Sequence, residues 1–208
     1  MGTPPASGVA PAAVASPAAA AGLVDVVTVI PDVVLDLRYA TADNFTHHRV
    51  YPVARCLLLA DVADRLADAA ATLRADGLRL VMWDCYRPAS VQRALWALVP
   101  DPRYVAEPRF DAAGRPTGGS AHSRGAAVDV SLADADGAPL AMPTDHDAFG
   151  PAAHRDHPAA DPAIRARLGR LDRAMTSAGF EGLATEWWHY GAAGAGARPL
   201  LDAPLAPP

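Results

Sequence analysis

The chain has 208 residues, of which 51% are hydrophobic, so it can bury one sizeable core. No internal repeat and no change of composition divides residues 23–192, which we expect to form a single domain. The formal net charge of −5 gives no basic surface for nucleic acid, and no stretch is apolar enough to predict a membrane span.

The two ends of the chain are low in complexity. Residues 1–22 are almost wholly Ala, Pro, Gly, Ser and Val, which cannot bury enough surface to offset the entropy of ordering, and residues 193–208 are rich in Gly, Ala and Pro. We expect a disordered N-terminal segment and a flexible C-terminal tail. The start lacks the basic and Leu-rich regions of a secretory signal, and a cytoplasmic as well as a periplasmic or secreted location stays open.

The first regular elements are expected directly after the N-terminal segment. Residues 23–30 and 33–39 are β-branched or alternating runs that Pro31 and Asp32 separate. This pattern predicts a strand, a turn and a second strand.

A helix, a strand and another helix are predicted in the middle of the chain. Residues 59–73 place apolar side chains at helical spacing, and residues 78–83 form a short apolar run typical of a buried strand. Pro88 is at a favoured first-turn position for an amphipathic helix over residues 90–99. Arg87 is therefore held at a junction between strand and helix, where it is a candidate functional cation.

Two further segments precede the C-terminal motif. Residues 101–120 contain scattered prolines, glycines and charges, which predicts a long loop that shapes a site. Residues 164–177 place apolar side chains on one side of a helix, and Gly179 is a C-terminal stop.

Two histidines and one aspartate supply the ligand count of a catalytic zinc site. Such a site takes three protein ligands and keeps a fourth position open, and His122, Asp129 and His189 meet this count, with Glu186 as a nearby base. Valine alternation around Asp129 predicts a strand with the carboxylate on the opposite face. The odd offset to His122 requires a bend, for which residues 123–125 are suited, and the spacing of Glu186 and His189 requires a helical turn or a bulge.

Four segments carry a resemblance to a known family. Residues 37–45 (LRYATADNF), 83–88 (WDCYRP), 120–129 (SAHSRGAAVD) and 186–190 (EWWHY) are similar to motifs of the zinc D-alanyl-D-alanine dipeptidases of the VanX type, in the family's order. This family is related to the zinc D,D-carboxypeptidases and the hedgehog domain. The resemblance runs roughly from residue 35 to 190.

The resemblance implies an α+β fold in which an antiparallel sheet carries the zinc ligands and helices pack on one side. It implies one zinc per chain and hydrolysis of the dipeptide D-alanyl-D-alanine, in cell-wall peptide metabolism. The implied catalytic residues are Glu186 as general base and Arg87 on the oxygen of the scissile bond. The implied substrate-binding residues are Ser120, Asp147, Tyr39 and Tyr51. His146 is a departure, because the family has an aromatic residue before the aspartate.

Several alternatives stay open. A D,D-carboxypeptidase or amidase acting on longer peptidoglycan peptides would use the same zinc ligands, and a hedgehog-like module would bind without catalysis, although it would not need Glu186. His146, His154 and His157 lie in segments typical of loops and are not expected to bind the metal. Cys56 and Cys85 either pair in an oxidising compartment or stay as buried thiols. The oligomeric state is open.

Overall fold

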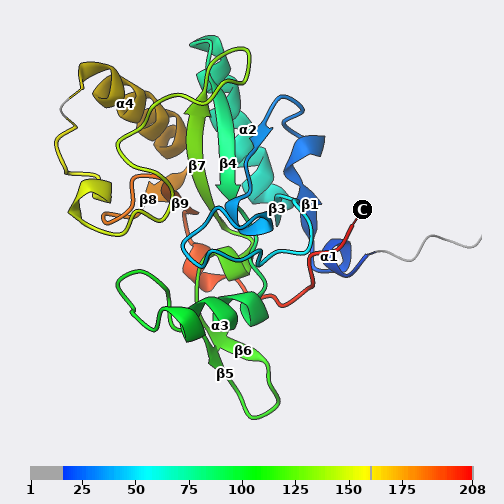
Figure 1. Ribbon diagram of the computed structural model, residues 1–208. Helices are drawn as coiled ribbons and strands as arrows, with labels where there is room; N and C mark the ends of the chain where they lie inside the picture. Colours follow the sequence, from blue (N-terminus) through cyan, green and yellow to red (C-terminus); the bar gives the residue numbers. More distant parts are fainter. Residues whose placement is uncertain (1–15, 160, 208) are drawn as a thin grey trace, which may run out of the picture.

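A five-stranded sheet forms the centre of the computed structural model, which describes residues 16–159 and 161–207 (Figure 1). In spatial order its strands are β2 (Val34–Leu35), β4 (Arg79–Asp84), β7 (Ala127–Ala133), β9 (His189–Ala192) and β8 (Phe180–Gly182). The pairs from β4 to β8 are antiparallel, and β2 is parallel to β4 at one edge. The α+β class is confirmed, with one parallel pair added to the antiparallel sheet.

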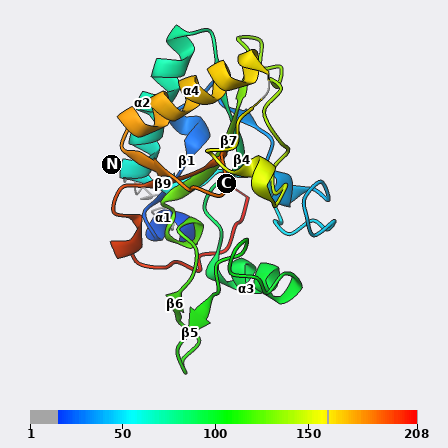
Figure 2. The same cartoon turned by 90° about the vertical axis from the view of Figure 1, so that its left-hand side faces the viewer.

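Two long helices cover one face of this sheet. Helix α2 (Ala60–Ala75) packs on β4 and on α4 (Pro162–Ser177), and α4 packs on β7 and β8 (Figures 1 and 2). The carboxylate of Asp161 accepts a hydrogen bond from the Ala163 amide at 2.7 Å and so caps the start of α4. The predicted packing of helices on one side is thus confirmed. The buried residues of α2 recur at helical spacing: Val62, Ala63, Leu66, Ala69, Ala70 and Leu73.

The two faces of β7 separate the core from the site. Val128, Val130 and Leu132 belong to the main hydrophobic core, and Asp129 alternates with them onto the opposite face. Strand β4 pairs with β7 through Met82 and Val130, but a register shift after Met82 brings Asp84 opposite Asp129. The bulge therefore presents two aspartates of adjacent strands on the same face.

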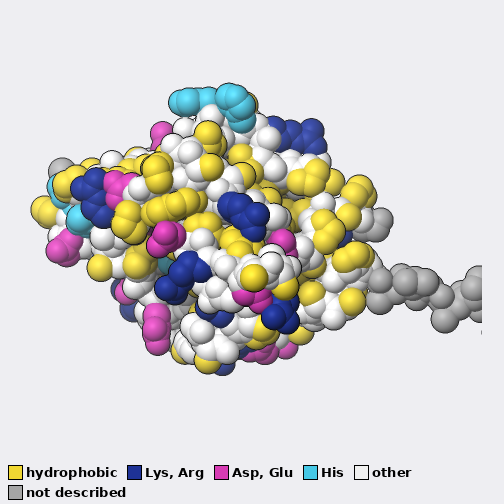
Figure 3. Space-filling model, turned by 90° about the horizontal axis from the view of Figure 1, so that it is seen from below, with side chains coloured by type: hydrophobic (Ala, Val, Ile, Leu, Met, Phe, Trp, Pro, Cys, Tyr) yellow, Lys and Arg dark blue, Asp and Glu magenta, His cyan; other side chains and the backbone are white. Residues whose placement is uncertain are grey.

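A smaller unit lies beyond the end of the sheet where β4 ends. It consists of helix α3 (Ala89–Leu98) and a hairpin of β5 (Arg109–Phe110) and β6 (Pro116–Gly118) (Figure 1). The segment 101–120, expected to be a loop, thus contains a short hairpin. Seen from below, this side of the molecule mixes apolar, basic and acidic side chains (Figure 3).

The N-terminal strands pair differently from the prediction. Strand β1 (Leu23–Asp25) pairs antiparallel with β3 (Leu57–Leu59) and forms no hairpin with β2. The chain leaves β1 through a 3-10 turn over Val26–Thr28, in which the Asp25 carboxylate accepts a hydrogen bond from the Val27 amide at 3.4 Å. The turn at residues 31 and 32 therefore joins elements of two different sheets.

Both chain ends contain residues that contact the body of the fold or form regular structure. Helix α1 (Pro17–Ala20) lies within the segment expected to be disordered, and residues 1–15 are outside the described residues. The C-terminal segment is fixed by hydrogen bonds of Leu201 with Ser123 and Ala89, and Leu205 is buried. Part of the segment for which we expect a flexible tail thus has partners in the body of the fold. Within the described ranges, no helix has both the length and the apolar character to cross a bilayer.

Candidate metal centre and its cavity

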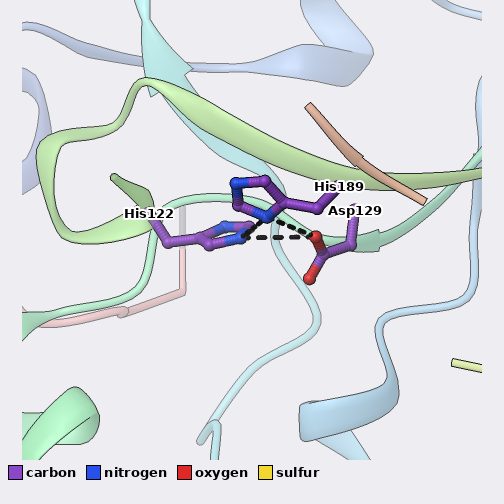
Figure 4. A group of neighbouring side chains, drawn as sticks. All are labelled: His122, Asp129 and His189. Atoms are coloured by element: carbon purple, nitrogen blue, oxygen red, sulfur yellow. Dashed lines mark hydrogen bonds and ion pairs between the residues drawn. The ribbon is translucent and has the colours of Figure 1, made fainter. Parts of the chain in front are cut away.

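Three side chains that could hold a metal ion meet on the open face of the sheet (Figure 4). Asp129 lies on β7, His189 is directly opposite it on β9, and His122 begins a 3-10 turn over His122–Arg124. His122 Nε2 is 3.4 Å and His189 Nδ1 is 3.0 Å from Asp129 Oδ1. The two ring nitrogens are 3.1 Å apart. The sequence-predicted ligands are thus brought together.

The spacing of these atoms fits tetrahedral zinc. Bonds of about 2.0–2.1 Å at tetrahedral angles separate two ligand atoms by about 3.3 Å, close to the three distances observed between His122, Asp129 and His189. His122 Nδ1 donates to the Cys85 carbonyl at 2.8 Å, so its Nε2 lone pair faces the other two ligands. Two imidazoles and one carboxylate are a donor set that suits zinc.

The ionisation of these groups is set by burial and by their mutual contacts. Burial lowers the pKa of His189, which favours the neutral ring that a metal requires. Burial alone would raise the pKa of Asp129, but the facing imidazoles, His122 first, hold it well below its usual value. Burial alone would lower the pKa of His122, but the carboxylates of Asp129 and Asp84 raise it. A metal ion would displace that proton.

The bend between His122 and Asp129 occurs where the sequence predicted it. Gly125 has φ +60°, a left-handed conformation that glycine adopts without strain. A Cβ at this position would lie 2.7 Å from Leu23 Cδ2 and 3.3 Å from the Leu59 amide. The tight turn thus places His122 over β7 and packs against β1 and β3 at the same time.

The metal centre lies in a cavity of about 780 Å³. Its polar lining includes all three candidate ligands together with Glu186 and Arg87. Aromatic rings line another part of it, where Tyr104 stacks on Phe149 with a centroid distance of 4.6 Å. A concave, partly apolar cavity with a few convergent polar groups is typical of a small-molecule site.

Glu186 reaches this cavity through a tight turn. The His189 amide donates to the Glu186 carbonyl at 3.4 Å, which accounts for the three-residue spacing. Among the described residues, the Glu186 carboxylate has no hydrogen-bond or ion-pair partner. Burial, followed by the negative charges of Asp129 and Asp147, raises the pKa of Glu186 to about 8. A carboxyl group with this pKa can exchange a proton near neutral pH.

Arg87 is fixed by two residues that the sequence reasoning missed. Its Nε and Nη2 donate to Asp84 Oδ2 at 3.0 and 2.5 Å, and its Nη1 donates to Gln92 at 2.8 Å. Burial alone would lower the pKa of Arg87, but the charge of Asp84 keeps it above its usual value. The signal that was overlooked is the acidic residue three positions before the arginine, in the same motif.

The substrate-binding candidates occupy different positions. Tyr39 lines the cavity and donates its hydroxyl to Asp147 Oδ2 at 2.9 Å. Ser120 also lines it, and its Oγ accepts a hydrogen bond from the His122 amide at 3.2 Å. Tyr51 is not among the lining residues, and its hydroxyl donates at 2.6 Å to Asp84, the carboxylate that also anchors Arg87. Tyr51 therefore belongs to the group of residues that hold Arg87 in place through Asp84.

Asp147 and His146 lie on a loop next to the metal centre. Asp147 lines the cavity and has φ +56°, which is uncommon for a residue other than glycine. Burial raises the pKa of Asp147. His146 was expected to be an ordinary loop residue, but its side chain is buried and its Nε2 is 3.1 Å from Asp129 Oδ2.

The two cysteines are joined in the structure. The disulfide links Cys56, directly before β3, with Cys85, directly after β4. The Cys85 carbonyl is also the acceptor for His122 Nδ1. The bridge therefore lies immediately behind one candidate metal ligand.

Comparison with known proteins identifies the family of the chain. Residues 19–205 match the family model described as D-ala-D-ala dipeptidase. The chain is 40% identical over 179 residues to the D-alanyl-D-alanine dipeptidase of Escherichia coli, covering 86% of this chain and 89% of that protein. It is 33% identical over 168 residues to the protein of the same name from Enterococcus faecalis, covering 74% of this chain and 83% of that protein. A crystal structure of a mutant vancomycin resistance D,D-pentapeptidase VanY with Zn(II) aligns with a TM-score of 0.39 and 17% identity, over 71% of this chain and 79% of that chain. The chain belongs to the D-ala-D-ala dipeptidase family.

Proposed function

We propose that this protein is a zinc-dependent dipeptidase that hydrolyses D-alanyl-D-alanine to two molecules of D-alanine. The observation that carries the proposal is the convergence of His122 Nε2, Asp129 Oδ1 and His189 Nδ1 in a cavity that Glu186 also lines. The names of the relatives, which align with most of the chain, support this substrate.

Glu186 is the proposed general base. His122, Asp129 and His189 would hold the zinc, which would act as a Lewis acid and make water acidic enough to lose a proton near neutral pH. The Glu186 carboxyl group lines the same cavity and has no partner among the described residues, so its ionised form is free to accept a proton from the attacking water. The same carboxyl group then gives a proton to the leaving amine.

Arg87 is the proposed donor to the oxygen of the scissile peptide bond. A guanidinium has five N–H donors, and Asp84 and Gln92 take three of them in hydrogen bonds. One N–H on each terminal nitrogen is left for a carbonyl oxygen that gains negative charge. Because the cation is already oriented, it needs little reorganisation during the reaction.

Asp147 is the proposed partner of the substrate's free ammonium group. Tyr39 holds Asp147 Oδ2, which leaves Oδ1 available, and Ser120 lies elsewhere on the cavity lining as a further contact for the dipeptide. An N-acylated substrate lacks this charge and leaves the carboxylate buried without its partner. Breaking a charge pair in this way costs about 2–5 kcal/mol, or roughly thirty- to several-thousand-fold in kcat/KM.

The test compares three substrates. We expect free D-Ala-D-Ala to be cleaved at least thirty-fold more efficiently than N-acetyl-D-Ala-D-Ala and than a pentapeptide that ends in the same pair. The variant Asp147→Ala should narrow this difference by slowing the free dipeptide, while Asp145→Ala, at an exposed aspartate on the same loop, should preserve it. Equal rates on all three substrates would refute the proposed dipeptidase activity and favour a D,D-carboxypeptidase.

A further inference from the structure

His146 makes a contact that neither the motif nor the proposed reaction explains. Its Nε2 is 3.1 Å from Asp129 Oδ2, the carboxylate oxygen that is not shared with the two histidine ligands. Both side chains are almost fully buried, at 2% and 5% exposure. Because a buried carboxylate oxygen can only accept, His146 must donate from Nε2.

This hydrogen bond bears on which carboxylate oxygen of Asp129 faces the two histidine ligands. Asp129 Oδ1 is 3.0 Å from His189 Nδ1 and 3.4 Å from His122 Nε2, so a single carboxylate oxygen faces the position where a metal ion would bind. Without a donor on Oδ2, rotation about the Cβ–Cγ bond would let the second oxygen compete for the same place. A donor on the far oxygen holds the carboxylate in the one-oxygen arrangement.

Packing alone does not account for a histidine here. Three aromatic rings surround the imidazole at centroid distances of 5.3–5.7 Å, from Trp83, Tyr39 and Trp188. A phenyl ring would suit these neighbours without bringing a polar atom inside. His146 Nδ1 even lacks a hydrogen bond of good geometry and lies 3.4 Å from Asp147 Oδ2. Burying a nitrogen without a hydrogen bond costs stability. The contact of the same ring with Asp129 accounts for a histidine at this position despite that cost.

We propose that His146 is a positioning residue of the metal centre, which fixes the Asp129 carboxylate by donating from Nε2 to Oδ2. The proposal rests on the zinc site proposed above. It is distinct from ligation, because the imidazole faces the oxygen turned away from the other ligands, and the described residues that could share one ion are His122, Asp129 and His189.

The effect is expected in zinc affinity. Loss of an outer hydrogen bond to a metal ligand lowers metal affinity or activity by about 10- to 100-fold. His146→Phe keeps an aromatic ring among its neighbours and removes the donor, so its zinc dissociation constant should rise by this factor. His146→Gln places an amide nitrogen near the position of Nε2 and should restore most of the affinity, whereas the shorter His146→Asn should not.

The measurement is competition for zinc against a chromophoric chelator, with folding of each metal-free variant checked by circular dichroism. His157→Phe is the control, because His157 is an exposed histidine. The ordering of the Gln and Asn variants keeps the test decisive if the Phe variant fails to fold. Zinc affinities of Phe, Gln and Asn variants all within about threefold of the wild type would overturn the proposal. If the wild type bound two zinc ions and the His146 variants bound one, the proposal would also be overturned, because His146 would then be a metal ligand. A wild-type protein that binds no zinc would instead refute the site itself.

Discussion

Asp84 offers the sharpest test of how the site is built, because it is fully buried and meets four donors. Its Oδ1 accepts from the Tyr51 hydroxyl at 2.6 Å and the Cys85 amide at 2.8 Å. Its Oδ2 accepts from two nitrogens of Arg87. In Asp84→Asn, one of the two oxygens becomes an NH2 group, so a donor faces a donor in either orientation of the amide.

The magnitude follows from burial. Removing one charge from a buried ion pair costs about 3–5 kcal/mol, since the remaining charge stays uncompensated. The Asp84 side chain is 0% exposed and the Arg87 side chain 9%. For a chain of this size, such a loss lowers the melting temperature by about 6–20 °C. The same substitution at Asp61, which is 53% exposed in its pair with Arg198, should cost at most about 1 kcal/mol.

Urea unfolding of the two variants and the wild type, followed by circular dichroism, gives the comparison. The free energy of unfolding of Asp84→Asn should fall well below that of Asp61→Asn. Its kcat should fall as well, because Arg87 loses its two-point anchor. An Asp84→Asn variant that costs less than 1 kcal/mol would refute the reasoning, since Arg87 would then need no buried partner.

Three further predictions concern the catalytic groups and the disulfide. Glu186→Gln should abolish turnover while zinc stays bound. In the metal-free protein the pKa of Glu186 is about 8, against 4.5 for the free side chain, so wild-type stability should fall as the pH rises between those values. In urea unfolding, the variant should therefore gain about 3–4 kcal/mol more at pH 8 than at pH 5, and an equal gain at both pH values would contradict this. Arg87→Lys keeps the positive charge but loses the planar guanidinium group with its several N–H donors, so kcat should fall about 10²–10³-fold in steady-state kinetics. An unchanged kcat with a raised KM would show that Arg87 acts in ground-state substrate binding. Cys56 and Cys85 are 29 positions apart, so replacing both by serine should lower the free energy of unfolding by about 3–4 kcal/mol, whereas no loss would show that the bridge is dispensable.

Periodicity in the sequence predicted the long elements well, because their apolar spacing is a local property. Helix α2 and strand β4 fall within a few residues of the expected ranges. The bend at Gly125 was also predictable, since glycine marks the backbone conformation that the turn requires. The metal ligands and Glu186 came from the spacing of their motifs and from the resemblance to a family.

The features that the sequence did not indicate depend on contacts between distant segments. Strand β1 pairs with β3 and not with its neighbour β2, and the bulge that turns Asp84 towards Asp129 arises from pairing with β7. His146 lies among Asp, Pro and Thr residues typical of a loop, yet Asp129 and three aromatic rings bury it. Leu205 follows a stretch rich in Ala and Pro, and it is buried because it joins a hydrophobic cluster with residues such as Leu57 and Tyr86.

Titration of the chelator-stripped protein with zinc, with hydrolysis of D-Ala-D-Ala as the readout, shows directly whether zinc is required for activity. We expect no activity in the stripped protein and a linear return of activity that ends at one zinc per chain. His189→Ala should fail to recover activity at that stoichiometry. Full hydrolysis by the stripped protein, or by His189→Ala, would contradict the assignment of His122, Asp129 and His189 as the ligands of a catalytic zinc.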